Sequence, residues 1–377
     1  MIETPSEKYI IGLTGKIASG KSVVRKMLEH LGAYSIDADA LSHRASAKGA
    51  PGYQPIIQAF GTWVLRPDGE IDRARLGRIA FGDPAAMSLL EGIIHPLVSQ
   101  ATGTMIRRAT QRVVVIEAIK LLEGSLHAQC NSIWVVNVPR EVQISRLVEK
   151  RGLTRAEALQ RIDFQGGPEK MLAAANVIIQ NDGNYEKTWK QVQAEWKKVA
   201  LPPAPEAETI TPLRGEFSVT RGRPRDSASI AQLINRLSQG QRHMTSEDVM
   251  AAFGEKAYML LHLNGKNVGV AGWQVENLLA RTTEFFIDPA VEVEKGLKSL
   301  INEVERASAD LQCEASILML PPSMAGLQDI WKQLGYEPRT SQDLSVRAWI
   351  EAANESIRPN TQLFFRQLRQ DRVLRPI

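Results

Sequence analysis

At 377 residues the chain exceeds the usual length of one domain, so we expect two domains, each with its own hydrophobic core. Its formal net charge of +4 is small for that length and spread along the sequence, which argues against a nucleic-acid partner. Two distant cysteines exclude a disulfide scaffold, and no apolar run approaches the ~18 residues that span a bilayer, so we expect a cytoplasmic protein without a membrane partner.

The first predicted element is an apolar strand, Tyr9–Thr14, which runs directly into the sequence GKIASGKS. Gly15 and Gly20 permit the sharp turn that brings successive amide N–H groups toward one point, and a helix-like run follows. This order predicts a phosphate-binding loop, in which Lys21 contacts the β- and γ-phosphates of ATP and the Ser22 hydroxyl binds Mg²⁺. The predicted nucleotide-binding residues here are Gly15, Ala18, Ser19, Gly20, Lys21, Ser22 and Val23.

Helix-like segments separate four further strand-like runs within residues 1–200. Their continuous apolar character predicts strands buried on both faces, as in a parallel sheet with helical crossovers, so the fold class is α/β. Ligands of such sheets lie beyond the carboxyl ends of the strands, so the phosphate-binding loop, Asp37–Asp39 and Glu117–Glu123 should share one cleft. The runs are Ala33–Ile36, Val113–Ile119, Ser132–Val138 and Asn176–Gln180.

Two carboxylates, Asp37 and Asp39, follow the second of these strands. One of them can orient an acceptor hydroxyl and accept its proton during phosphoryl transfer. Aspartate is equally common as the N-cap of a following helix. Both roles stay open, one for each residue.

Five segments of this half occur in the order found in dephospho-coenzyme A kinases, which the chain resembles over about residues 10–195. The resemblance implies a P-loop kinase with a helical region over the substrate and a mobile lid. It also implies ATP-dependent phosphorylation of the ribose 3′-hydroxyl of dephospho-coenzyme A (dephospho-CoA), with Asp39 as the catalytic carboxylate. The segments are GLTGKIASGKS, IDADALSHR, GEIDRARLGRIAFGDP, IIHPLV and VVNVPREVQISRLVEKRGLTRAEALQRIDFQ.

The resemblance implies roles for other polar residues as well. Lid arginines can neutralise charge on the transferred phosphoryl group, and Arg161 is the catalytic candidate among them. Asn181 and Gly183 match a turn beside the adenine. His95 precedes Pro96, which favours extended geometry, and both packing and catalysis stay open for it. The lid arginines are Arg146, Arg151, Arg155 and Arg161, and a second group, Arg73, Arg75 and Arg78, faces either coenzyme phosphates or solvent.

The sequence departs from the family pattern at three places. Lys16 and Ala18 stand where the family commonly has glycines. The segment Ala118–Leu122 replaces the usual Asp-Ile-Pro-Leu-Leu and leaves the two flanking glutamates as substitutes for its acidic group. Met171–Ala174 is neutral where lids often carry basic residues. Since a phosphate-neutralising arginine is worth ~10³ to 10⁵ in rate, activity depends on another lid arginine.

A proline-rich segment at residues 201–215 predicts an extended linker between a kinase domain, residues 1–200, and a second domain, residues 216–377. From Phe217 onward the pattern predicts a strand, helices and a hairpin at Asn264-Gly265-Lys266, an α+β domain that resembles the Gcn5-related N-acetyltransferases. An active member needs a glycine-rich loop for the pyrophosphate of acyl-CoA, whereas Ile287–Leu297 is acidic and retains one glycine. Acetyl transfer and an inactive domain that packs, oligomerises or senses CoA both stay open. Tyr336 is either an acid or a packed aromatic residue.

Two rivals to the kinase prediction remain. The first is a P-loop kinase for another small metabolite, and the second is a nucleotide-dependent switch or scaffold without turnover. A GTPase is disfavoured because the sequence has no Asn-Lys-x-Asp motif.

Overall fold

The computed structural model describes residues 8–199, 215–238, 242–358 and 360–370. Contacts divide them into one unit of residues 8–21 and 32–183 and another of residues 22–31 and 184–370. The predicted linker lies outside the described residues except for Gly215, and the predicted domain boundaries remain a prediction. No helix in these ranges combines the length and the apolar character needed to span a membrane.

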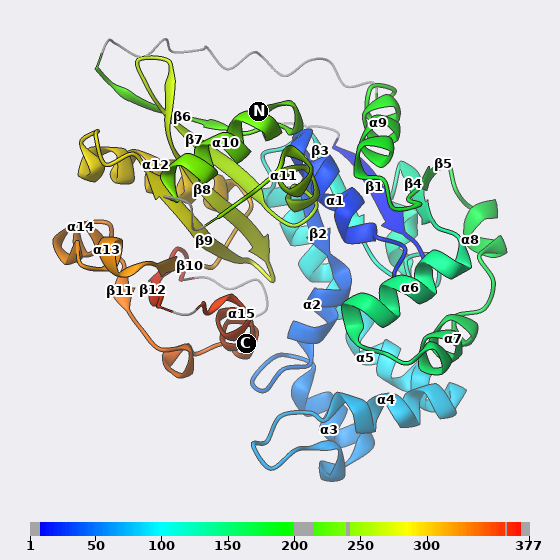
Figure 1. Ribbon diagram of the computed structural model, residues 1–377. Helices are drawn as coiled ribbons and strands as arrows, with labels where there is room; N and C mark the ends of the chain where they lie inside the picture. The colour runs from blue at the N-terminus through cyan, green and yellow to red at the C-terminus, as the bar shows by residue number, and fades with distance from the viewer. Residues whose placement is uncertain (1–7, 200–214, 239–241, 359, 371–377) are drawn as a thin grey trace, which may run out of the picture. The chain divides into compact units, whose positions relative to one another are not determined.

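The first unit is built on a five-stranded parallel sheet with the order β2-β3-β1-β4-β5 (Figure 1). The predicted α/β fold is confirmed, and each strand ends within two residues of its predicted limits. The central strand β1 is fully buried at Ile11 and Leu13, and the loop that follows it therefore emerges between β3 and β4. The strands are β1 (Tyr9–Thr14), β2 (Tyr34–Asp37), β3 (Val113–Glu117), β4 (Ser132–Asn137) and β5 (Val177–Gln180).

Two groups of α-helices lie between strands of this unit, and a short 3₁₀ helix, η2, lies between β3 and β4. One group lies between β2 and β3, and a lid-like group lies between β4 and β5. The lid helix α7 starts at a capping box of Thr154 and Glu157, and α6 ends at Gly152, whose φ of 65° suits glycine. The first group is α2 (Ala38–Ala45), α3 (Tyr53–Phe60), η1 (Thr62–Val64), α4 (Arg73–Gly82) and α5 (Pro84–Arg108); after β3 come η2 (Ser125–Gln129), α6 (Arg140–Arg151), α7 (Arg155–Phe164) and α8 (Glu169–Ala173).

The extended geometry expected for His95 is wrong, because His95 and Pro96 lie inside α5. A proline in a helix interior removes one backbone hydrogen bond and costs ~3 kcal/mol. Burying one aliphatic side chain contributes ~1.5–3 kcal/mol, so the buried face of α5 offsets that cost. The buried residues around the proline are Ile94, Val98, Ala101, Thr102 and Met105.

The second unit has a seven-stranded sheet with the order β11-β12-β10-β9-β8-β7-β6. All neighbours are antiparallel except β9 and β10, and the β7–β8 turn has positive φ at Asn264 and Gly265. The predicted α+β domain and its order of strand, helices, hairpin, strand and helix are confirmed. The strands are β6 (Phe217–Arg221), β7 (Ala257–Leu263), β8 (Lys266–Glu276), β9 (Leu279–Ile287), β10 (Ala315–Leu320), β11 (Glu337–Pro338) and β12 (Gln362–Gln367).

Helices cover both faces of this sheet (Figure 1). Helix α12 buries Leu297 and Ile301 against one face, and α10 and α11 bury Ile234 and Val249 against the other. The helices of this unit are α1 (Lys21–His30, from its second residue), α9 (Tyr185–Trp196), η3 (Pro224–Asp226), α10 (Ser227–Leu237), α11 (Ser246–Ala252), α12 (Val293–Asp310), α13 (Pro322–Ala325), α14 (Gln328–Gln333), η4 (Ser341–Asp343) and α15 (Arg347–Ser356).

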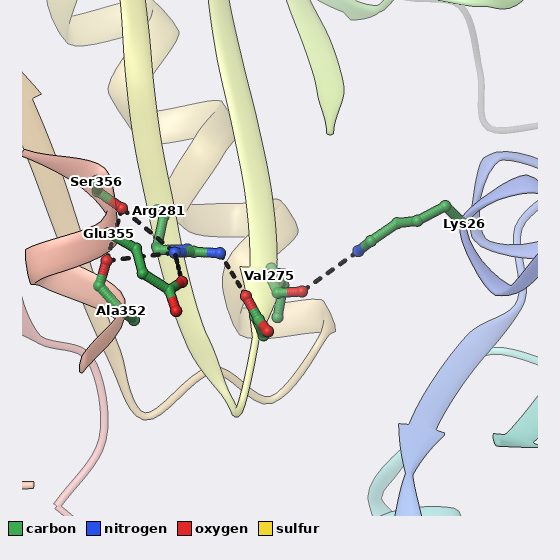
Figure 2. Close-up of polar contacts among 7 residues, drawn as sticks. Lys26, Val275, Arg281, Ala352, Glu355 and Ser356 are labelled. Atoms are coloured by element: carbon green, nitrogen blue, oxygen red, sulfur yellow. Dashed lines mark hydrogen bonds and ion pairs between the residues drawn. The ribbon is translucent and has the colours of Figure 1, made fainter. Parts of the chain in front are cut away.

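Buried polar contacts complete the second unit (Figure 2). Arg281 of β9 donates to the carbonyl oxygen of Ala352 at 3.2 Å and forms an ion pair with Glu355 at 3.3 Å, so α15 is held to the sheet. The Nζ of Lys26 in α1 donates to the carbonyl oxygen of Val275 at 3.3 Å.

Candidate active site

The loop after β1 adopts a conformation that requires glycine at both ends. Gly20 has a φ of 90°, and a Cβ there would lie 2.0 Å from Nδ2 of Asn181. A Cβ on Gly15 would lie 2.6 Å from the carbonyl oxygen of Val136. Ala18 has a φ of 57°, a left-handed conformation at a position where the family commonly has glycine. The departure from glycine at Ala18 therefore carries backbone strain.

Two side chains hold this loop through its carbonyl groups. Asn181 Nδ2 donates to the carbonyl oxygen of Ser19 at 2.8 Å, and Asn181 is buried. Arg146 donates to the carbonyl oxygens of Ala18, Ser19 and Asn181 at 3.1, 3.2 and 3.0 Å. Sequence reasoning placed Asn181 beside the adenine and Arg146 in the lid, and gave no signal for these contacts with the loop backbone.

Lys21 of the phosphate-binding loop lies among charged side chains of the first unit. Its side chain is buried and donates to the Gly15 carbonyl oxygen at 3.0 Å. The pKa of Lys21 is lowered from its usual value. Burial is the main cause, and the nearby carboxylates of Glu117, Asp39 and Asp37 offset part of that effect. The lysine and these carboxylates, from the ends of β2 and β3 and the start of α2, therefore lie within electrostatic reach of one another.

The two aspartates after β2 have different roles. Asp37 is the N-cap of α2 and accepts a hydrogen bond from the Ala40 N–H at 2.8 Å. Asp39 accepts a hydrogen bond from the Ile119 N–H at 3.1 Å. Burial first, and then the neighbouring Asp37, raise the pKa of Asp39 to about 6. A carboxylate with this pKa is ionised at neutral pH and is still able to accept a proton, as a general base requires.

The lid arginines do not all approach this cluster. Arg151, at the end of α6, lies within electrostatic reach of Lys21 and lowers its pKa. Arg151 and Arg161 are both exposed, and Arg161, the candidate chosen from the sequence, acts on Glu157 of its own helix, α7. Arg155 forms an ion pair with Glu141 at 2.9 Å. Of the four lid arginines, Arg151 is thus the one whose charge acts on Lys21, as the smallest of the influences on the pKa of that lysine, whereas Arg146 contacts the loop backbone.

The other residues predicted from the sequence differ in their environments. Glu117 is buried beside Lys21, whereas Glu123 is exposed and pairs with Lys120 at 3.5 Å. Of the two flanking glutamates, Glu117 is the one that supplies acidic character at the strand ends. Arg73 donates to the His43 carbonyl oxygen, Arg75 pairs with Asp72, Arg78 is exposed, and His95 lines a shallow groove with Gln100, Arg107 and Ser125.

Comparison with known proteins identifies the first half of the chain. The dephospho-CoA kinase family model matches residues 9–187. The dephospho-CoA kinase of Geobacter metallireducens is 44% identical over 192 residues, which cover 50% of this chain and 96% of that protein. The chain belongs to the dephospho-CoA kinase family. Membership supports the predicted kinase over the rival reading of a scaffold without turnover.

Two solved structures are also similar to parts of the chain. The dephospho-CoA kinase from Campylobacter jejuni is 25% identical, with a TM-score of 0.38, and the match covers 51% of this chain and 97% of that one. An acetyltransferase of the GNAT family from Staphylococcus aureus is 13% identical, with a TM-score of 0.33, and the match covers 41% of this chain and 100% of that one.

The second unit has its own loop between a strand and a helix, at residues 288–292 between β9 and α12. Pro289 has no N–H, and the N–H groups of Ala290 and Val291 donate to the side chain and the carbonyl oxygen of Asp288 at 3.0 and 3.2 Å. Gly296 is buried inside α12, where an added Cβ would lie 2.9 Å from Leu261. The N–H groups of Ala290 and Val291 are therefore occupied within the loop.

Proposed function

We propose that the first unit transfers the γ-phosphoryl group of ATP to the ribose 3′-hydroxyl of dephospho-CoA, with Asp39 as the base. The carrying observation is Asp39 itself, a carboxylate with a raised pKa that the Ile119 N–H orients next to the lysine of a phosphate-binding loop. Asp39 accepts the proton of the attacking hydroxyl. Lys21 and Arg151 neutralise charge that develops on the phosphoryl oxygens, the main contribution to rate in this chemistry.

A Mg²⁺ ion fits the donors available at this site. Ser22 follows Lys21 directly and would hold the ion through its hydroxyl, and no cluster of three or more metal-ligating side chains occurs within the described ranges. That donor set suits Mg²⁺, which proteins usually bind through few side chains together with substrate phosphates. When bound there, Mg²⁺ would supply positive charge that offsets the charge of the phosphate oxygens. We place the reaction in the cytoplasm, where free cysteines such as Cys130 and Cys313 persist.

For the second unit we propose an accessory role without acetyl transfer. The N–H groups of Ala290 and Val291 are bonded to Asp288, and Pro289 has none. Asp288, Glu292 and Glu294 place negative charge where an acyl-CoA pyrophosphate would bind. Tyr336 is buried, donates to the Ser316 hydroxyl at 2.9 Å and packs edge-on against Trp331. Burial raises the pKa of Tyr336 further, which supports packing over acid catalysis.

The test of the kinase is consumption of ATP by the full chain with Mg²⁺ and dephospho-CoA, with the product identified by mass. We expect CoA from the wild type, and loss of turnover in Lys21→Ala and Asp39→Asn. Asp39→Asn should still bind ATP, because the amide preserves the size of the side chain. A wild-type chain that binds ATP and never forms CoA would refute the assignment.

A further inference from the structure

Lys16 brings a second ammonium group to the phosphate-binding loop. Its Nζ donates to the main-chain carbonyl oxygen of Gln165 at 2.5 Å. No carboxylate among the described residues lies within ion-pair distance of this Nζ. A lysine whose partner is a neutral carbonyl keeps its full charge available for an anion.

The same lid residue also engages the loop backbone. Oε1 of Gln165 accepts a hydrogen bond from the Ile17 N–H at 2.8 Å, and Nε2 of Gln143 donates to the Ile17 carbonyl oxygen at 2.9 Å. Gln165 follows α7 and precedes Gly166, whose φ is 66°, and Gly167. Two oxygens of one residue thus occupy two loop donors, at a position where two glycines permit the lid backbone to move.

A cavity of about 330 Å³ lies beside these contacts and is lined by Lys16, Ser19, Arg140 and Asp163 among others. The Ser19 hydroxyl is buried and has no hydrogen-bond partner. Arg140 is paired with Asp163 at 2.6 Å. The cavity therefore combines an ammonium without a carboxylate partner and an unpartnered buried hydroxyl, which together suit an anionic oxygen.

We propose that Lys16 is a second phosphate-binding lysine, and that Gln165 occupies the donors of Lys16 and Ile17 until the terminal phosphate of ATP displaces it. This inference rests on the proposed function, because it assumes that ATP binds at the loop. A phosphate oxygen carries negative charge and replaces two neutral carbonyl oxygens, so the exchange strengthens both hydrogen bonds. The lid residue then leaves the loop as the triphosphate enters.

The test measures dissociation constants of ATP and ADP, without acceptor substrate, for the full chain and its variants. Lys16→Met should weaken ATP by about tenfold, the loss of one hydrogen bond to a charged group, and should affect ADP much less. Lys16→Arg should restore most of the ATP affinity. Gln165→Ala should tighten ATP a few-fold, because the Ile17 N–H no longer has to exchange partners. The matched control, Gln143→Ala, removes a bond to the Ile17 carbonyl and should not tighten ATP.

Thermal melting of each variant verifies that it is folded. Equal effects of Lys16→Met on ATP and ADP, or none, would overturn the role of Lys16. An unchanged ATP affinity in Gln165→Ala would overturn the displacement. Neither result touches the kinase assignment, which fails separately if the wild type binds ATP and forms no CoA.

Discussion

The loops after β1 and β9 each lead from a strand into the N-terminus of a helix, and they differ in what their backbone amides can bind. The first has Gly20 in a left-handed conformation and is held through its carbonyl groups by Arg146 and Asn181. The second has Pro289 and an aspartate that accepts the next two amides. The dipole of a helix is available in both, so side chains decide whether an anion can use it.

The largest effect is expected on kcat when an arginine near the first loop is removed. Arg151→Ala should lower kcat by ~10³ or more, because an arginine that neutralises the transferred phosphoryl group has that magnitude. Arg161→Ala, on the neighbouring lid helix, should change kcat by less than about tenfold, because the charge of Arg161 acts on Glu157 of its own helix. Steady-state turnover of both variants gives the comparison directly, and the reverse order would restore the candidate chosen from the sequence.

The pH dependence of kcat/KM should follow the ionisation of Asp39. Its pKa is about 6 in the fold, so kcat/KM should fall about tenfold per pH unit below that value as the base becomes protonated. Protonation of Asp39 has the opposite effect on the stability of the fold. The folded-state pKa lies above the ordinary value of 3.8, so this group stabilises the fold at low pH and that contribution is lost as the pH rises through 6.

Asp39→Asn separates these two effects. The variant should lose activity at every pH and should be more thermally stable than the wild type at pH 7, because no charge is buried at this position. Activity and melting temperature measured from pH 5 to 8 provide the check. A wild-type profile without an inflection near 6 would mean that another group limits the reaction.

The sequence predicted the strands of the first unit well because each is a continuous apolar run bounded by turn-forming residues. It also predicted the loop, because Gly15, Gly20 and Lys21 form a short, local pattern. It did not predict the contacts of Arg146 and Gln165, which join residues more than 100 positions apart and depend on how the lid folds back. The sequence could not decide between Arg151 and Arg161 for the same reason, since both carry the same charge on adjacent helices, and the choice between them stays a prediction.

A glycine substitution in each helix-entry region should expose the difference in backbone demand. Gly20→Ala places a Cβ at positive φ and against Asn181, so the strain alone should cost ~1–2 kcal/mol and ATP binding should weaken. Gly296→Ala lies inside α12, where alanine is favoured by ~1 kcal/mol and the close neighbour is the flexible end of Leu261. We therefore expect a lower melting temperature for the first variant and a near-neutral change for the second.

The control for this pair is Gly32→Ala, since Gly32 also has a positive φ, of 104°, and an added Cβ there would contact nothing within 4 Å. It should share the stability loss of Gly20→Ala without its effect on ATP. If ATP affinity falls equally in both, backbone strain would be the cause and the fit of Gly20 against Asn181 would carry no function.

The smallest expected effect is an absence of change at the second loop. Hydrogen exchange of the full chain with saturating CoA or acetyl-CoA should leave residues 288–297 as in the free protein, because Ala290 and Val291 already donate to Asp288 and the nearby carboxylates repel a pyrophosphate. Slower exchange in the first unit, where CoA is the expected product, provides the internal control for binding. Protection of residues 288–297 by acetyl-CoA would mean that the loop rearranges and releases its amides for the ligand. The loops after β1 and β9 would then differ in their conformations without ligand, and both would accept an anion.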